Sequence, residues 1–340
     1  MFFALTSDQQ EFGAAVRGYL ADRFDIDAVR AVVDDRDSDG HPASLWKAAA
    51  EQGWLAVTVP EEHDGLGLGL IEAQVIARAL GAGVAPGPWR GTVLAAEAIR
   101  LAGSDEQKAA WLPRLAAGDA VGAFTLRGSA PGTLPNVEYG AVADVIVARS
   151  GDGLALVETG AFTATPLRSY DGTARVASVH VEGAGEALPG ATAEVVADLE
   201  ARATVLVAAD LTGVAREALS RTVAYDRERE QFGVPVGSFQ AIKHALADLH
   251  VGITMAEHAS LYAAHAVDEK QDDAALAVAV AKAKASDVAL QATAAMIQYH
   301  GGIGFTWEHE AHFFYKRAKR LAGQYGDGDA QREKIAALTI

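Results

Sequence analysis

The first 120 residues repeat apolar side chains at helical spacing. From Ser7 to Phe24 large apolar residues recur every four positions, which predicts an amphipathic helix with Ser7 as its N-cap. Three further helices are expected over residues 43–57, 70–83 and 104–117, the last of them opened by an N-cap serine. Because turns rich in Gly, Pro and Asp separate these segments, the pattern predicts an N-terminal α-helical domain over residues 1–120.

The hydrophobic pattern changes near Val121, where short apolar runs bounded by Gly and Pro replace the helical period. Four such runs predict strands over residues 121–126, 143–150, 153–158 and 174–183. The intervening residues 131–136, PGTLPN, are expected to form a loop. A short middle β-domain over residues 121–190 follows from this pattern.

The helical period returns near Ala191 and continues to the end of the chain. Three long helices are expected over residues 196–227, 239–267 and 273–299. An apolar stripe in the second of them predicts its buried face: Phe239, Ile242, Leu246, Leu249, Ile253 and Leu261. The sequence therefore predicts an α+β chain that ends in a four-helix bundle over residues 191–340, with apolar surface to spare for oligomerisation.

Composition narrows the function classes. Lys plus Arg number 29 and Asp plus Glu 45, a net charge of −16 at pH 7 that argues against nucleic acid and anionic membranes as partners. The absence of cysteine excludes disulfides, thiolate nucleophiles and thiolate metal sites, and no metal centre is expected. Since the first residues lack a secretion signal and no apolar run is long enough to span a membrane, we expect a cytoplasmic protein.

A first cluster of candidate chemistry runs from Tyr225 to Leu249. One helix is expected to end near Arg229, and Gln231 to Pro235 to form the turn before the next helix. An arginine at such a turn can clamp a diphosphate, because a guanidinium pairs bidentately with phosphoryl oxygens. The residues alone fit a plain helix connection with the solvated charge run DRERE at least as well.

A second cluster runs from Gln298 to Glu310, with the sequence QYHGGIGFTWEHE. Its three glycines follow a long helix, where missing side chains permit positive φ and close approach of a ligand to the backbone. No strand is expected before these glycines, so the nucleotide-binding turn of a Rossmann fold is excluded.

In their order and spacing these clusters resemble the acyl-CoA dehydrogenase family, over nearly the whole chain. The family motif Tyr-x-x-x-Arg-x-Gln-Phe-Gly-x-Pro, followed by Phe-Gln-Ala and Leu-Ala-Asp, is matched by Tyr225, Arg229, Gln231, Phe232, Gly233, Pro235, Phe239, Gln240, Ala241, Leu246, Ala247 and Asp248. The later motif Gln-x-x-Gly-Gly-x-Gly is matched by Gln298, Gly301, Gly302 and Gly304, followed by Phe305. The N-terminal stretch ending PEEHDGLGLG is a weaker match.

The resemblance implies a three-domain subunit that uses FAD to desaturate an acyl-CoA thioester between its α and β carbons, with an electron-transferring flavoprotein as acceptor. It also implies that the two turns contact the adenosine diphosphate half of an FAD held mainly by a neighbouring subunit. Arg229 would then meet the diphosphate. The residues expected around the adenosine half are Gln231, Phe232, Gln240, Gln298, Gly301 and Gly302.

Two parts of the family pattern are missing. The middle domain of the family cradles the flavin ring with a Thr-Glu-Pro segment, but here Leu126 and Arg127 replace Glu and Pro, although Thr125 and Ser129 remain nearby. The catalytic glutamate near the C-terminus is replaced by Tyr325, a poor base at neutral pH. Three acids are weak substitutes for that base: Asp327, Glu200 and Asp210.

Both losses favour the shorter subunit of a heterotetramer, in which a second acyl-CoA dehydrogenase subunit supplies the base and the flavin-ring site. Two alternatives stay open: a self-sufficient dehydrogenase with an unconventional base, and a flavin-free scaffold or acyl-CoA-binding subunit. A homo-oligomer also remains possible. The resemblance implies a role in fatty acid or sterol side-chain catabolism without identifying the acyl chain.

Overall fold

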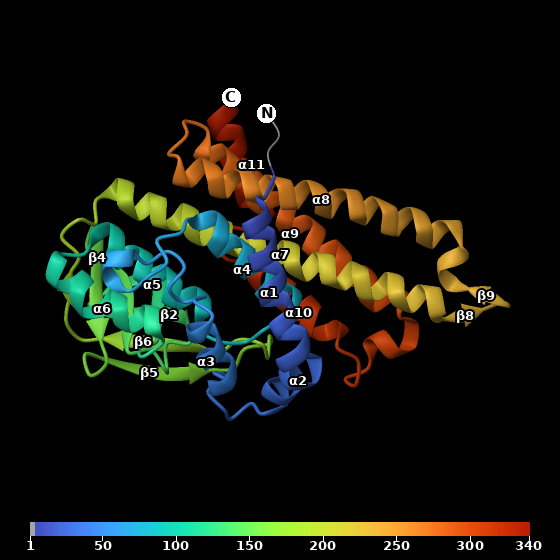
Figure 1. Ribbon diagram of the computed structural model, residues 1–340, viewed down its shortest axis with the longest axis horizontal. Coiled ribbons are helices and arrows are strands. Elements are labelled where there is room, and N and C mark those ends of the chain that lie inside the picture. Colours follow the sequence, from blue (N-terminus) through green and yellow to red (C-terminus); the bar gives the residue numbers. More distant parts are fainter. Residues whose placement is uncertain (1–3) are drawn as a thin grey trace. The chain divides into compact units, whose positions relative to one another are not determined.

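The computed structural model describes residues 4–340, which divide into two compact units (Figure 1). The helical unit comprises the residues up to Arg30, Gln74–Ala85 and Thr204–Ile340. The mixed unit comprises Ala31–Ala73 and Pro86–Ala203. The long helix α7, Ala193–Glu228, begins in the mixed unit and ends in the helical one.

The N-terminal part forms the predicted helices and two more. Its elements are α1 (Ser7–Arg23), α2 (Ile26–Asp34), α3 (Ala43–Glu51), the 3₁₀ turn η1 (Glu61–His63), α4 (Leu70–Ala82), α5 (Trp89–Ala102) and α6 (Asp105–Ala117). The sequence analysis missed α2 and α5. The cap of α1 is Thr6 rather than Ser7, because Thr6 and Gln9 bond each other's backbone in a capping box. Ser104 caps α6 in the same way with Gln107, as expected.

Seven strands form two sheets in the mixed unit. They are β1 (Gly122–Ala130), β2 (Gly132–Glu138), β3 (Val145–Ser150), β4 (Gly153–Glu158), β5 (Phe162–Leu167), β6 (Val176–Val181) and β7 (Glu186–Ala187). One sheet has the order β1-β3-β4-β7 and the other β2-β6-β5, with β1 and β3 the parallel pair. The fully buried Leu134, Ile146, Val157 and Val179 join both sheets in one core.

The prediction of a loop over residues 131–136 is wrong, because β2 occupies most of that stretch. Its pairing with β6 shifts register between Leu134 and Val137, around Pro135, which has no N–H to donate. Leu134 and Val137 nevertheless point into the core, being at most 1% exposed. Burial of these two side chains therefore outweighs the local turn signals of Pro and Asn.

The C-terminal part is helical as predicted. After α7 come β8 (Glu230–Gln231), β9 (Val234–Pro235), η2 (Val236–Ser238), α8 (Gln240–Asp268), α9 (Ala274–Tyr299), η3 (Gly301–Phe305), α10 (Ala311–Ala322) and α11 (Gly328–Thr339). Helix α9 packs against α8, α10 and α11. The expected buried stripe of α8 is only partly buried, since Ile253 is inaccessible whereas Phe239 is 39% exposed. The predicted domain limits at 120 and 190 fall between α6 and β1 and between β7 and α7, and they stay predictions.

Helices α4 and α7 cross so closely that glycine is required at the contact. A Cβ atom on Gly213 would lie 2.0 Å from the carbonyl oxygen of Arg78, and one on Gly81 would lie 2.2 Å from that of Asp210. Both oxygens belong to the backbone, so they cannot rotate away from an added methyl group. The crossing therefore fixes the position of α7 within the helical unit.

Replacing Gly213 with alanine is expected to destabilise the chain by about 1–3 kcal/mol, because the added methyl group overpacks this crossing. Gly18→Ala in α1 is the matched control, since no atom lies within 4 Å of the Cβ that it would add. That control should be neutral or stabilising by up to about 1 kcal/mol through helix propensity. Urea unfolding followed by circular dichroism measures both, and equal stability of the two variants would contradict the expectation.

Within residues 4–340, no helix is both long enough and apolar enough to cross a membrane.

Candidate functional site

The turn after α7 is a tight β-hairpin. Glu230 pairs with Pro235 and Gln231 with Val234, which leaves Phe232 and Gly233 as a two-residue loop. Both loop residues have positive φ, 55° and 79°, as the commonest two-residue hairpin loop requires. A bulky aromatic in this conformation is uncommon, so the local sequence accepts strain to present Phe232 at the tip.

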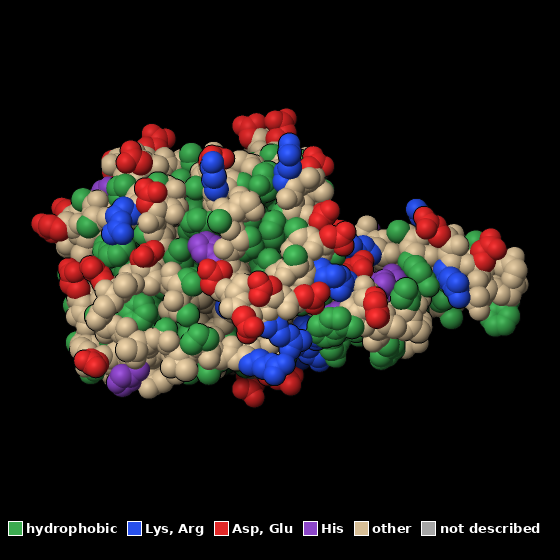
Figure 2. All heavy atoms as spheres, turned by 90° about the horizontal axis from the view of Figure 1, so that it is seen from below, with side chains coloured by type: hydrophobic (Ala, Val, Ile, Leu, Met, Phe, Trp, Pro, Cys, Tyr) green, Lys and Arg blue, Asp and Glu red, His purple; other side chains and the backbone are tan. Residues whose placement is uncertain are grey.

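The hairpin presents its side chains to solvent. Phe232 is 93% exposed, and the Arg229 side chain makes no hydrogen bond or ion pair with any part of the chain that the structure describes. The end of the molecule that carries β8 and β9, at the right of Figure 2, exposes hydrophobic, acidic and basic side chains together. The Gln231 amide donates only to the neighbouring Glu230 carbonyl. The free guanidinium can bind a negatively charged group, and the exposed Phe232 ring can stack on a planar one.

The glycine turn follows α9 directly. Gly301 has φ 63°, and a Cβ on Gly301 or Gly302 would meet no atom within 4 Å. Packing within the chain therefore does not require Gly302 to be glycine, and a side chain there would occupy space on the outside of the turn. The neighbouring Phe305 is 78% exposed, and Gln298, one helical turn earlier, is also exposed. The turn leaves its outer surface open for close approach by another molecule.

The structure brings together the two clusters that the sequence separates by about seventy residues. Tyr225, one turn before Arg229, stacks on His300, which immediately precedes Gly301, with ring centroids 4.4 Å apart. Arg221 of α7 also pairs with Glu310 at the start of α10, at 3.0 Å. The sequence analysis did not single out His300, although a histidine directly before the diglycine was the available signal.

Two of the three candidate bases make structural contacts. Asp210 is 4% exposed and accepts two hydrogen bonds from Arg317, at 2.9 and 2.7 Å, so its carboxylate is committed to a buried ion pair. Asp327 is exposed and caps α11 by accepting from the Ala330 N–H at 3.0 Å. Glu200 lies half-buried on α7 in the mixed unit. These contacts give Asp210 and Asp327 structural functions.

Tyr325 lies in a connector between α10 and α11 that buried polar groups hold in place. The fully buried Lys282 amine donates to Ser286 Oγ, the Ala322 carbonyl and the Gly326 carbonyl, at 2.9 to 3.0 Å. The Tyr325 carbonyl accepts from the Gln331 side chain at 2.6 Å. Burial lowers the pKa of Lys282 to about 8, with the charge of Asp327 opposing that shift. In the sequence, the only sign of this buried amine was a charged residue, Lys282, within the Ala-rich α9.

In the region expected to cradle a flavin ring, the polar side chains form hydrogen bonds with the backbone of the β-domain. The Thr125 hydroxyl is nearly inaccessible and accepts from the Arg127 N–H at 3.1 Å. Ser129 donates to the Arg149 carbonyl, and the Arg149 side chain donates to the Leu126 carbonyl. Both surviving hydroxyl groups thus bond within β1 or to β3 rather than projecting freely.

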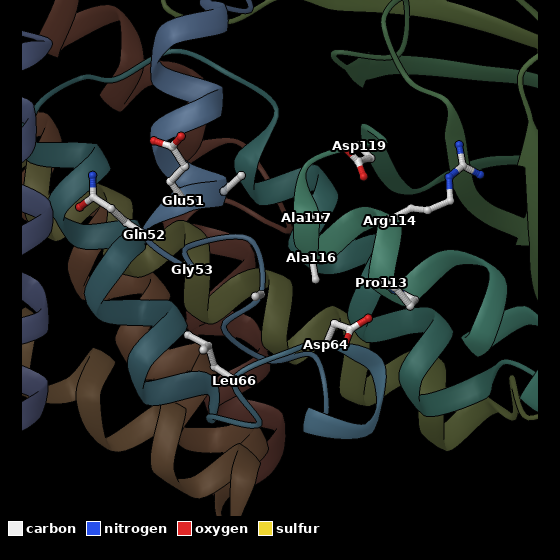
Figure 3. A pocket seen from close by; sticks show the side chains of 12 residues that line it. Glu51, Gln52, Gly53, Asp64, Leu66, Pro113, Arg114, Ala116, Ala117 and Asp119 are labelled. Carbon is white, nitrogen blue, oxygen red and sulfur yellow. The ribbon is translucent and has the colours of Figure 1, made fainter.

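An open hollow of about 770 Å³ lies in the mixed unit, lined by residues of α3, α6 and the loop after η1 (Figure 3). Glu51, Asp64 and Asp119 supply carboxylates there, and Arg114 supplies a guanidinium whose other face lies over the Trp111 ring. None of the residues of either sequence cluster lines it. The hollow is open to solvent and its lining is mainly apolar, so it carries no comparable case for a cofactor.

Two models of known families match the chain. The N-terminal domain of acyl-CoA dehydrogenase matches residues 6–119, and the C-terminal domain of acyl-CoA dehydrogenase matches residues 200–339. The acyl-CoA dehydrogenase IpdE2 of Mycolicibacterium smegmatis is 35% identical over 317 residues, covering 92% of each chain. IpdE2 of Mycobacterium tuberculosis is 36% identical over 313 residues, covering 92% of this chain and 91% of its own length.

Solved structures agree over the full length. A chain of the ChsE4-ChsE5 complex from Mycobacterium tuberculosis superposes with a TM-score of 0.91 at 27% identity, covering 99% of this chain and 98% of the other. A chain of the Tcur3481-Tcur3483 steroid ACAD, G363A variant, superposes with a TM-score of 0.88 at 26% identity, covering 97% of each. The motif that holds Arg229 and the glycine turn both lie within the matched C-terminal region.

Proposed function

Because this chain belongs to the acyl-CoA dehydrogenase family of FAD-dependent oxidoreductases, we propose that it is a subunit that lends the adenosine half of an FAD site to a partner subunit. In this family FAD accepts the hydride removed from the β carbon of an acyl-CoA. In the present chain, Arg229 would hold the diphosphate. The residues that would surround the adenosine are Gln231, Phe232, Gln240, Gln298, Gly301 and Gly302.

The observation that carries this proposal is the outward-facing geometry of both turns. The Arg229 side chain has no hydrogen bond or ion pair within residues 4–340, and the outer side of Gly301 and Gly302 is open. A guanidinium in water makes only exchangeable hydrogen bonds with the solvent, whereas one that pairs with a diphosphate makes strong bidentate bonds. Such residues fit a ligand that approaches from outside the chain, as a flavin held by a neighbouring subunit would.

A division of labour with a partner follows from what this chain lacks. Thr125 and Ser129 are engaged with backbone groups of the β-domain, and Leu126 and Arg127 replace the residues that the family uses for the flavin ring. The family's glutamate is Tyr325 here, while Asp210 is bound to Arg317. We therefore assign both the ring site and the α-proton base to the partner.

The solved relatives support a heteromeric assembly with a second acyl-CoA dehydrogenase subunit. The ChsE4-ChsE5 structure is a complex of two proteins, and the Tcur3481-Tcur3483 pair is described as a steroid acyl-CoA dehydrogenase. By analogy, the substrate of the assembled enzyme would be the acyl-CoA thioester of a fatty acid or sterol side chain. An electron-transferring flavoprotein would be the acceptor.

Flavin counting tests the proposal. The chain purified alone is expected to hold essentially no FAD, while the complex recovered with a tagged chain from its native host should contain FAD and a second family member. Absorbance spectra and denaturing release of the flavin give the FAD content per complex. One tightly bound FAD in the isolated chain would contradict the proposal and favour a self-sufficient enzyme.

A further inference from the structure

His300 joins the ends of three helices. The side chain is 5% exposed at the end of α9 and stacks on Tyr225 near the end of α7. On its other side His309, which precedes α10, lies with its ring centroid 4.5 Å away. These three rings, the Tyr225–His300–His309 stack, connect the helix that leads to Arg229 with the helix that leads to Gly301.

Hydrogen bonds fix each imidazole in one neutral form. His300 Nδ1 lies 2.6 Å from the Met296 carbonyl oxygen, which can only accept, so Nδ1 carries the hydrogen. His309 Nδ1 accepts from the Ala311 N–H at 3.1 Å, so the hydrogen of a neutral His309 is on Nε2. The same nitrogen of His309 lies 4.0 Å from Glu310 Oε2.

Other contacts hold the segment before α10 against the same helices. Arg221 of α7 pairs with Glu310, and Arg30 donates to the carbonyls of Trp307 and Glu308 at 3.0 and 2.7 Å. Trp307 in turn stacks on His312 with centroids 4.3 Å apart. These contacts hold the segment on both sides of His309.

The surroundings of His300 disfavour its protonated form. From α7 it faces Tyr225, and from the segment before α10 it faces His309 and Glu310. Within α9 it donates to the Met296 carbonyl. Burial is the largest effect and lowers the pKa of His300, as His309 also does, whereas the Met296 carbonyl and Glu310 raise it. The Glu310 carboxylate is shared, since one oxygen accepts from Arg221 and the other lies 4.0 Å from His309 Nδ1.

We propose that the Tyr225–His300–His309 stack is a pH-sensitive positioning element. With the His300 imidazole neutral it holds the Arg229 hairpin and the glycine turn in the arrangement that receives a dinucleotide, and protonation of His300 separates the two turns. This inference rests on the proposed function, since it concerns positioning of the same flavin-binding turns. His300 and His309 act through the backbone of these turns and need not touch the cofactor.

Acidification is expected to weaken the packing around His300. A histidine whose folded pKa lies below its usual 6.5 binds fewer protons when folded, so its contribution to stability is lost as the pH falls below 6.5. Asp226, next to Tyr225, acts oppositely. Within residues 4–340 its buried carboxylate oxygens have no hydrogen-bond partner. Burial raises the pKa of Asp226 to about 6, so this residue favours the folded state as the pH falls from 6 toward 3.8. Opening on acidification therefore cannot come from Asp226.

The first test is hydrogen exchange of residues 296–310 in the chain without FAD, corrected for the intrinsic pH dependence of exchange. From about pH 7.5 to about pH 5.5 we expect protection to fall, because buried His300 takes up a proton less readily than an exposed histidine. The double variant His300→Phe/His309→Asn keeps an aromatic ring at 300 and an acceptor for Ala311 but cannot titrate. Its protection should not change over this pH range.

His244→Asn, on the exposed side of α8, is the control and should keep the wild-type pH profile. An unchanged pH profile in the double variant would overturn the proposal, because His312 or another group would then be responsible. A pH-independent wild-type chain would overturn it without any variant. Thus the conclusion does not depend on whether the double variant folds.

A second measurement follows FAD release from the assembled complex over the same pH range by flavin fluorescence. Release with the midpoint seen in hydrogen exchange, and its loss in the double variant, is expected. Local opening without flavin release would overturn the positioning role. Complexes that contain no FAD at any pH would contradict the proposed function instead, and the exchange measurement would still decide whether the stack responds to protonation.

Discussion

The complex containing Arg229→Ala is expected to lose most of its FAD on purification. Removing the guanidinium would leave the diphosphate without its charged partner, and the loss of one member of such a pair costs about 3 kcal/mol, or about 100-fold in affinity. The β-hairpin should persist, because only the backbone of Arg229 bonds to Tyr225 and Val236. FAD content and the dissociation constant for added FAD measure the effect.

Arg227→Ala removes the same charge from the same stretch and is the matched control. Arg227 is exposed in the last turn of α7 and lies outside the proposed clamp. Its complex should retain FAD with nearly unchanged affinity. Equal flavin loss in both variants would indicate a general charge effect, whereas full retention in both would exclude diphosphate binding by Arg229.

Replacing Arg317 with methionine should produce the largest loss of stability. The Arg317 guanidinium donates to both oxygens of Asp210 and to the Ala85 carbonyl, and both charged side chains are about 5% exposed. Without Arg317 the Asp210 carboxylate would stay buried but lose its ion pair. Breaking a buried pair in this way costs about 3–5 kcal/mol. Urea unfolding of the chain, followed by circular dichroism, gives the change in the free energy of unfolding.

A second substitution identifies the cause. Because the penalty comes from the unpaired charge, Asp210→Leu combined with Arg317→Met should be more stable than Arg317→Met alone. The surface pair of Arg332 and Asp287, whose side chains are 52% and 40% exposed, is the control, and Arg332→Ala should cost less than about 1 kcal/mol. A small effect of Arg317→Met would contradict a structural role for Asp210 and return it to consideration as a base.

Local sequence signals determined most of the secondary structure. Helical periodicity placed α7, α8 and α9 within a few residues of their observed ends, because each helix buries one continuous face. The same reasoning failed at β2, where Pro135 and Asn136 indicate a loop but Leu134 and Val137 fill the core between the sheets. It also placed Phe239 in the core although this residue lies at the exposed start of α8.

The sequence by itself determined the two family motifs, since the residue types and spacings around Arg229 and Gly301 are short-range properties of the chain. Only the tertiary structure decided that these motifs lie together, because the contact between Tyr225 and His300 depends on the packing of α7 against the end of α9. It likewise decided that Asp210 belongs to an ion pair, since Arg317 is more than one hundred residues away in sequence. Periodicity identifies the buried face of a helix, but the partner of a buried charge depends on how distant helices pack.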